Sequence, residues 1–485
     1  MVTKVLEFAP LAELGDWINS LLVTGDPYLS GLRSNNAVIV ILLGSALTTV
    51  SFLLFKRQRT IKPADNTPEK SPPRTLNVKQ WFPQSFEYPD FEASPYALSD
   101  IKPPMYRPFR WGEYHVTMGI RNMQWGEWIE LDDQFNAYYR IRKDRIERKG
   151  ELVVKVLPPS VREHDGEDGN IRIRGGAAGA IELVHELAEY LSRRYPTTFQ
   201  ITRHASTMPD YPTGWGGTPP VKSVFIVPQQ EQFELPLPLP LDFIPGDEKP
   251  DIEKQGAIAM RIAALLVQDD LAVMVEGSNG GYYFQAGGIV VPGFWRMEDK
   301  IGMRLDEIHL SGNVPQYQEK LHTSFERFFR RLPVDKPVAR NNYFVQVSPP
   351  SSATPSVDPD ELAWGETVLG PEDEYGGTKG SSGGDPPVLV VAPETLRLRT
   401  ERQTLRRLPR SGAVVFTIRT YLVPVEELAQ EPGVAARFAS AVRSWPEEVR
   451  EYKGERRYGD VLVRYLDEVA SRDDAERVEA KPYPF

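Results

Sequence analysis

Seven arginines stand close together near the C-terminal end of this sequence, and such a cluster can bind an anion. They lie between Leu396 and Tyr421, a stretch with one acid, Glu401, in a chain whose net charge is -10. A guanidinium group holds a carboxylate or a phosphate through charge-assisted and often paired hydrogen bonds. The stretch can therefore grip an anionic ligand, such as a phosphate or a cofactor carboxylate, or form structural salt bridges with acids of the same chain. Spacing alone leaves both hypotheses open.

The elements that hold these arginines follow from their neighbours. Leucine and arginine alternate from Leu396 to Arg399, which is the period of a half-buried strand. We expect one helical turn over Thr404–Leu408, a turn at Pro409–Gly412 and a strand inside a sheet over Ala413–Tyr421. Arg419 lies in this second strand, where a buried guanidinium is costly unless an anion meets it.

The composition limits the chemistry of the chain. Its 41% apolar and 26% charged residues are typical of a globular protein. There is no cysteine, which excludes disulfides, thiolate zinc sites, cysteine-ligated iron–sulfur clusters and a thiolate-ligated heme. The acidic balance argues against nucleic acid as the main partner.

One uninterrupted apolar segment predicts a membrane anchor. Residues 37–55 carry no charge, and a helix needs roughly 20 residues to cross a bilayer. A cleaved signal peptide is the alternative, but the segment begins late and no small-residue cleavage site follows it. Basic residues follow directly between Lys56 and Lys62, so the positive-inside rule predicts a single-pass protein with a cytosolic C-terminal domain, in the endoplasmic reticulum or another endomembrane.

The remaining boundaries follow from composition. Residues 1–36 form a mixed N-terminal tail, residues 56–99 a Pro-rich tether and residues 100–455 the globular domain. Within that domain, residues 348–387 are rich in Gly, Ser and Pro and are predicted to be a disordered insertion. Residues 456–485 are predicted to form a charged tail.

The globular domain mixes helical and strand patterns. Helices are expected over Gly176–Tyr195 and Lys254–Asp270, where apolar residues recur at helical spacing. Strands are expected over Leu271–Glu276 and Tyr282–Val291, joined by a Gly-rich turn, and again over Val338–Val347. The mixture predicts an α+β fold.

Two groups of residues are similar to catalytic motifs but have simpler interpretations. His185-Glu186 lies on a predicted helix, yet a zinc-protease motif needs a second histidine where this chain has Glu189. The acids of residues 130–133 can do acid–base chemistry in principle. A helix cap or a solvated face is the preferred interpretation of that cluster.

Four segments of the chain carry a resemblance to a known family. In chain order they read MGIRNMQWGEWIELDD, GGIVVPGFWRMEDKIGMRLDEIH, PVARNNYF and ERQTLRRLPRSGAVVFTIRTY. Together they span about residues 101–454, and they resemble the heme-dependent oxidative N-demethylase alpha-subunit-like family. The chain departs from bacterial relatives, which usually have Trp at the position of Tyr343 and lack both the anchor and the insertion. It therefore looks like a fungal, membrane-anchored member.

The resemblance implies a PAS-like antiparallel sheet core with surrounding helices and a heme held by a histidine. It implies oxidative demethylation, or another oxidation, of a small amine-type metabolite. The electrons would come from a separate flavin or iron–sulfur partner. This chain has no cysteine for a cluster, and Gly277–Gly281 is a hairpin turn rather than a dinucleotide fingerprint.

The resemblance also suggests site residues. His309 lies at a turn after a helix within a matching segment, so it is the expected heme ligand, with a structural role as the alternative. Asn342 or Tyr343 is expected to orient substrate or oxygen. Three arginines lie inside matching segments and are expected to bind the heme propionates: Arg296, Arg402 and Arg419.

Three functions fit these expectations. The first is a membrane-anchored heme oxidoreductase that takes a small-molecule substrate and uses a reductase partner. The second is a non-catalytic heme- or ligand-binding PAS-like sensor or adaptor at a membrane. The third is a membrane scaffold in which the fold survives without heme. A visible spectrum separates the third from the other two.

Overall fold

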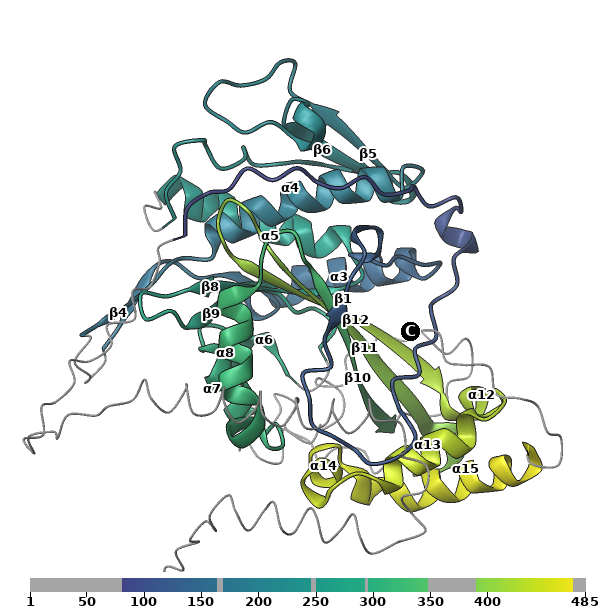
Figure 1. The fold of residues 1–485 in the computed structure, drawn as a ribbon. Helices are drawn as coiled ribbons and strands as arrows, with labels where there is room; N and C mark the ends of the chain where they lie inside the picture. Colours follow the sequence, from purple (N-terminus) through teal and green to yellow (C-terminus); the bar gives the residue numbers. More distant parts are fainter. Residues whose placement is uncertain (1–80, 164–168, 246–249, 293–294, 348–389, 474–485) are drawn as a thin grey trace, which may run out of the picture. The chain divides into compact units, whose positions relative to one another are not determined.

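The computed structural model describes residues 81–163, 169–245, 250–292, 295–347 and 390–473. Their central element is a seven-stranded antiparallel sheet (Figure 1). In spatial order its strands are β1 (Arg121–Asn122), β10 (Val338–Val347), β11 (Leu396–Arg407), β12 (Val414–Pro424), β8 (Asp270–Glu276), β9 (Tyr282–Gly288) and β2 (Val154–Val156). The expected α+β fold is confirmed in its broad form.

The arginine-rich stretch forms two long neighbouring strands of this sheet. β11 runs unbroken to Arg407, so the helical turn predicted over Thr404–Leu408 is wrong. Within that stretch, Thr404 pairs with Ala339 on one side and Thr417 on the other, so backbone groups are satisfied by the ladder and not by a helix. The turn before β12 is confirmed and contains Gly412 at a φ of 72°.

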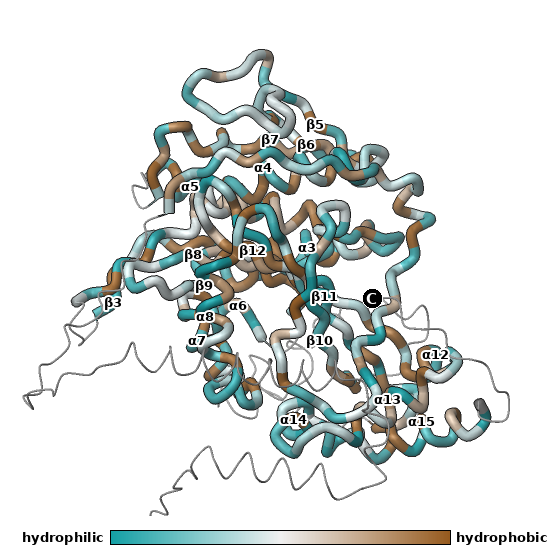
Figure 2. Tube along the Cα trace, viewed as in Figure 1, coloured by the Kyte–Doolittle hydropathy of each residue, from teal (hydrophilic) through white to brown (hydrophobic). Residues whose placement is uncertain are grey.

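The two faces of the sheet are covered by different helices. On β8, Leu271, Val273 and Val275 pack in one core with α3 (Phe135–Lys149), α4 (Ala177–Arg194) and α5 (Pro250–Leu266). The alternating residues Ala272 and Met274 belong to a second core with α7 (Leu305–Ser311) and α8 (His322–Arg331). Figure 2 shows apolar residues concentrated where β12 passes beneath α3.

Helix α4 is buried on both sides, which explains its content of small residues. Fourteen of its eighteen residues are buried. A Cβ added to Gly256 of α5 would lie 2.5 Å from the Ala177 Cα, so the two helices pack backbone to backbone. The outer side of α4 is covered by a three-stranded sheet: β5 (Phe199–Arg203), β6 (Val221–Ile226) and β7 (Glu231–Glu234). A two-stranded sheet, β3 (Ser160–Arg162) with β4 (Ile171–Ile173), lies apart from it.

A third core lies at the far end of the long strands β10–β12 (Figure 1). It is formed with α12 (Val425–Ala429), α13 (Val434–Arg443), α14 (Glu447–Tyr452) and α15 (Gly459–Asp473). The charged tail predicted over residues 456–485 therefore needs correction, because much of it is α15. Leu462 and Leu466 on that helix are fully buried against α13, which gives the segment an apolar side at helical spacing.

The last residues of the predicted tether, from residue 81 onward, also pack against the rest of the domain. Residues 81–97 have no helix or strand, as expected, but several of their aromatic side chains are covered. The indole nitrogen of Trp81 donates to the Pro409 carbonyl at 3.1 Å. Tyr88 stacks on Trp215 with ring centres 3.9 Å apart. The domain thus begins near residue 81, earlier than the predicted boundary at residue 100.

Several predictions concern residues outside the described part of the chain. These are the N-terminal tail 1–36, the anchor 37–55, the tether up to residue 80 and the insertion 348–387. Within the described residues, no helix has both the length and the apolar character needed to span a bilayer.

Candidate functional site

Arg419 forms a structural salt bridge with an acid of its own chain. Its Nη2 lies 2.6 Å from Asp132 Oδ2, and the two side chains are 0% and 1% exposed. The other oxygen of Asp132 accepts a hydrogen bond from Gln268 Nε2 at 2.9 Å. The guanidinium also lies over the Tyr138 ring, 4.4 Å from its centre. Of the two hypotheses for this arginine, the structural salt bridge is confirmed.

Arg402 is held in the same way on the neighbouring strand. Its Nε lies 3.0 Å from Glu130 Oε1, and its Nη1 donates to the Trp128 carbonyl at 3.3 Å. Glu130 also accepts a hydrogen bond from the Tyr421 hydroxyl at 2.8 Å. The acidic segment expected to cap a helix or face solvent is therefore clamped to the back of the sheet by buried arginines.

A cavity of about 250 Å³ opens on the opposite face of the sheet. Its floor is formed by β8–β12, and its other walls include α6 (Met297–Lys300), α7 and α8. Because side chains alternate along a strand, the cavity receives odd-numbered residues of β11 and even-numbered residues of β10 and β12. Much of the wall is apolar, with side chains such as Met274, Phe284, Leu305, Phe325, Phe329 and Ile418.

His309 lies in the last turn of α7 and lines this cavity. Its Nδ1 is 2.7 Å from the Leu305 carbonyl oxygen, which can only accept, so Nδ1 carries the proton and Nε2 is left as the acceptor. Nε2 forms no hydrogen bond within the described residues. The ring stacks on Tyr317, with centres 4.8 Å apart, and meets Phe325 edge-on at 4.9 Å.

The electrostatic surroundings keep His309 neutral. Burial lowers its pKa to about 4, more than offsetting the hydrogen bond to Leu305, and the nearby charges of Arg340 and Lys300 lower it further. At neutral pH the imidazole is therefore unprotonated at Nε2, which is the form that binds a metal.

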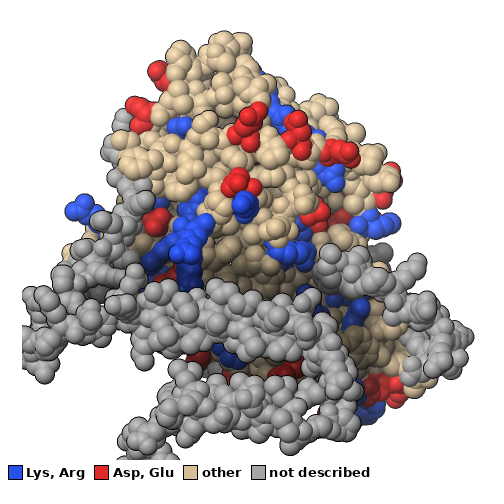
Figure 3. Space-filling model, viewed as in Figure 1, with Lys and Arg blue, Asp and Glu red and all other residues tan. Residues whose placement is uncertain are grey.

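The sheet supplies polar groups to the same cavity. Across β10 and β11, Asn342 pairs with Glu401 and Arg340 with Gln403, and all four line the cavity. Among the described residues, five cationic side chains line it, against two acids. On the face shown in Figure 3, lysine and arginine side chains gather beside a hollow, whereas most of the visible acids lie above it.

The structure brings together three of the six predicted site residues. His309, Asn342 and Arg296 line the cavity, and Arg296 is also paired with Asp299 at 2.9 Å. Tyr343 does not line it: as the neighbour of Asn342 on a strand, it points to the opposite face, where Trp445 Nε1 donates to its hydroxyl at 3.3 Å.

Arg402 and Arg419 also require correction as predicted propionate ligands. Neither lines the cavity, and each is paired with an acid on the back of the sheet. The matching motif signalled their importance, but not which face of the strand they occupy.

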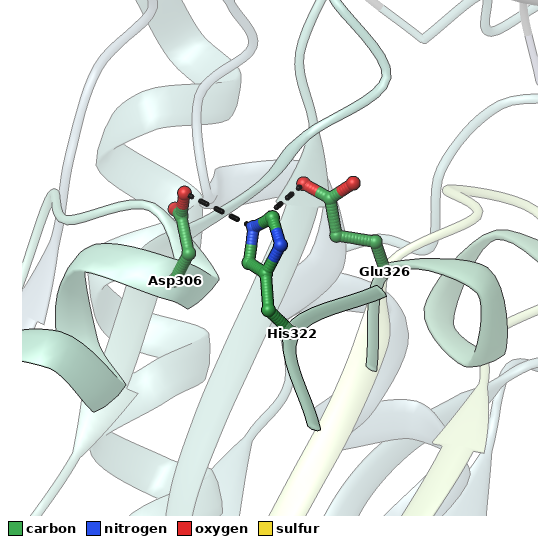
Figure 4. A group of neighbouring side chains, drawn as sticks. All are labelled: Asp306, His322 and Glu326. Atoms are coloured by element: carbon green, nitrogen blue, oxygen red, sulfur yellow. Dashed lines mark ion pairs between the residues drawn. The ribbon is translucent and has the colours of Figure 1, made fainter. Parts of the chain in front are cut away.

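A group of possible metal ligands lies elsewhere, between α7 and α8. Asp306, His322 and Glu326 place one ligand atom each within 4.8 Å of one another (Figure 4). Arg304 forms ion pairs with both carboxylates, and Arg330 Nη2 lies 3.7 Å from Glu326 Oε2. The two guanidinium groups supply the positive charge that a metal ion would otherwise bring.

A comparison with known protein families identifies the family of this chain. Residues 119–463 match the family described as Haem-dependent oxidative N-demethylase, alpha subunit-like. The chain belongs to this family. The match contains His309 and every strand that lines the cavity, so the family and the site coincide in the sequence. The resemblance read from the four motifs is confirmed.

The cavity residues fit the heme that the family's name implies. His309 offers a neutral Nε2 whose tautomer is fixed by a backbone carbonyl, as metal-ligating histidines usually are. The apolar wall suits a porphyrin. Arg296 and Lys300, from the same α6–α7 region as His309, are the cations that would pair with its propionates.

Sequence reasoning missed four basic residues that line the cavity: Lys300, Arg340, Arg399 and Lys453. Arg340 lies within the matched PVARNNYF segment, two residues before Asn342, so the period of a strand already placed it on the same face. Lys453 follows α14 and gave no signal, because only the tertiary fold brings it to β10.

We predict that Arg419→Met destabilises the fold by roughly 3–5 kcal/mol, because Asp132 is left charged and buried without its partner. Urea unfolding measures the loss. Arg340→Met is the matched control: Arg340 has no carboxylate partner among the described residues, so its removal should cost far less. Equal losses in the two variants would contradict the assignment of Arg419 as a structural residue.

We also predict that His309 makes the heme-free protein sensitive to acid. Its pKa is about 4 when folded and 6.5 ordinarily, so between these values the unfolded chain binds the proton and the folded chain does not. Stability should therefore fall as pH drops from about 6.5 to about 4, and fall less in His309→Gln. His185 has a similarly lowered pKa in both proteins, so the difference between their unfolding curves reports His309. Parallel curves would refute the claim.

Proposed function

We propose that the protein is a heme-dependent oxidoreductase that removes an N-methyl group from a small amine. The observation that carries this proposal is the neutral Nε2 of His309 at the wall of a largely apolar cavity, inside the family-matched region. When bound, the heme supplies dioxygen activation, which the side chains of this chain cannot supply themselves.

The chain's own residues bind and position the reactants. In this proposal His309 holds the iron from α7, and its hydrogen bond to Leu305 keeps the ring oriented. The apolar wall excludes bulk water from the reacting methyl group. Asn342, on the floor of the cavity, can donate to and accept from a substrate, and it has no hydrogen bond to the described residues that would compete.

The electrons must come from outside the chain. Oxidative demethylation consumes dioxygen and two electrons with two protons, and it yields the demethylated amine, formaldehyde and water. This sequence has no cysteine to ligate a cluster. A separate flavin or iron–sulfur protein is therefore part of the proposal.

We further propose that the seven-stranded sheet is the counterpart of the PAS-like core implied by the family resemblance. An antiparallel sheet with the ligand cavity on one face and short helices over that cavity supports this assignment.

The heme proposal predicts a Soret band in the visible spectrum of protein purified after expression with heme supply. His309→Ala should abolish the band, because the iron loses its protein ligand. The matched control is His185→Ala: His185 is held by the Pro236 carbonyl at 2.8 Å and does not line the cavity. Wild-type protein without a Soret band, or an unchanged band in His309→Ala, would overturn the assignment.

We propose in addition that residues 37–55 anchor the protein in an endomembrane with the heme domain in the cytosol. The uncharged segment and the basic residues after it support this. We predict that the full chain stays with membranes after alkaline carbonate extraction, and that a variant without residues 1–61 moves to the supernatant. Full-length protein in the supernatant would contradict the anchor.

A further inference from the structure

Two cations of the cavity form no ion pair with the described residues and are not among the cations assigned to the proposed heme site. Arg340, on β10, forms no ion pair and no hydrogen bond with the described residues, and its Nε is buried without a partner. Lys453, just after α14, is 3% exposed and also lines the cavity. They reach the cavity from elements other than α6 and α7, which carry Arg296, Lys300 and His309.

Lys453 is held in place without being neutralised. Its Nζ donates to the Tyr343 carbonyl and lies 4.3 Å from the centre of the Tyr343 ring, 4.5 Å from that of Phe344. A lysine has three donors, and this one forms a single hydrogen bond within the described residues. The aromatic rings orient the ammonium group, and the remaining donors are left for a ligand.

Among the described residues, a single acid acts on both Arg340 and Lys453. Glu401 is the acid that acts electrostatically on Arg340 and on Lys453. The same carboxylate is 3.4 Å from Arg399 Nε and accepts from Gln403 Nε2 at 3.2 Å. Among the described residues, the carboxylate near Arg340 and Lys453 is therefore already paired with Arg399. Buried cations in excess of their counter-ions are unfavourable unless a ligand brings the missing negative charge.

The protonation of these groups is consistent with a missing anion. Burial lowers the pKa of Lys453 to about 7, with Glu401 opposing and Arg340 adding to the shift. Burial likewise lowers the pKa of Arg340. An anion bound between them would reverse both effects. The phenol of Tyr114, which lines the cavity near Arg340, adds a neutral donor to the same region.

We propose that Arg340 and Lys453 form a subsite for a carboxylate carried by the substrate. The substrate class is then an N-methylated amino acid, with a carboxylate and a methylamine in one small molecule, rather than a simple alkylamine. The amine half rests on the proposed function. Asn342 and Glu401 pair across the strands beside Arg340, so a molecule held by its carboxylate brings its amine next to an amide and a carboxylate.

The decisive experiment compares two probes that differ in charge but hardly in shape. N,N-dimethylglycine carries the carboxylate, and N,N-dimethylglycinamide replaces it with a neutral amide. Their dissociation constants are measured by calorimetry on the full-length protein, with and without heme. We expect the acid to bind at least ~10-fold more tightly than the amide, since a charge-assisted pair is about twice as strong as a neutral hydrogen bond.

Substitutions test whether Arg340 and Lys453 cause the preference for the acid over the amide. R340M should remove the preference for the acid, and R340K should retain part of it. The matched control is R140M, because Arg140 is exposed and donates only to the Asn136 carbonyl of its own helix. The heme content of R340M should equal that of the wild type. If R340M does not fold, K453M is measured in its place.

The outcomes separate this subsite from the heme proposal. Equal affinity for acid and amide in the wild type overturns the subsite. Loss of heme from R340M with the acid preference retained also overturns it, because the cations then hold the propionates of the cofactor. A wild-type protein that binds no heme refutes the proposed function alone, since the acid preference is still measured on the heme-free protein.

Discussion

Two ion pairs, one fully buried and one with a partly exposed acid, fix how the first half of the domain meets its sheet. Asp132 and Glu130 reach down from the segment before α3 and meet Arg419 and Arg402 on adjacent strands. Removing one member of such a pair leaves a charge in the interior, which is far more costly than replacing both members by apolar groups. The two pairs therefore fix the position of the segment before α3 relative to strands β11 and β12. They set the position of Trp128, which is fully buried, and of the helix that follows.

These ion pairs occupy one face of the two strands, and the opposite face lines the cavity. On β11, Arg402 and Arg406 face the helices, whereas Glu401 and Gln403 face the cavity. Neighbouring side chains on a strand point in opposite directions. Any shift of the strands at these ion pairs would therefore also move the residues that face the cavity. A site placed on the central strands of a sheet is positioned more precisely than one placed on loops. His309 on α7, the proposed heme ligand, is the exception and is oriented by its hydrogen bond to the Leu305 carbonyl.

The strands, the α+β class and the family could be predicted from the sequence because they depend on local period and on motifs. His309 and Asn342 were reached through those motifs. The faces of the arginines were not. The alternation of leucine and arginine over residues 396–399 predicted a half-buried strand, but β11 is buried on both faces, and the alternation does not continue beyond Arg399. The acids of residues 130–133 gave no sign that they were counter-ions, since their partners lie almost three hundred residues away. Helix α15 is different. Its apolar spacing at 462, 466 and 469 was readable and was obscured by the surrounding charges.

The packing of Trp81 has a consequence for where this domain ends. The indole covers Gly412 so closely that a Cβ there would lie 2.3 Å from the ring, and Arg407 lies 5.0 Å from the ring centre. The family match begins only at residue 119 and stops at 463, before the buried Leu466. The family match thus covers the part of the fold that relatives share. The buried residues outside the match show that further segments are needed to cover the core of this fold. A fragment cut at the family limits would uncover the arginine turn at one end. At the other end it would lose most of α15 and expose the core side of α13, so it would be prone to aggregate for reasons unrelated to its chemistry.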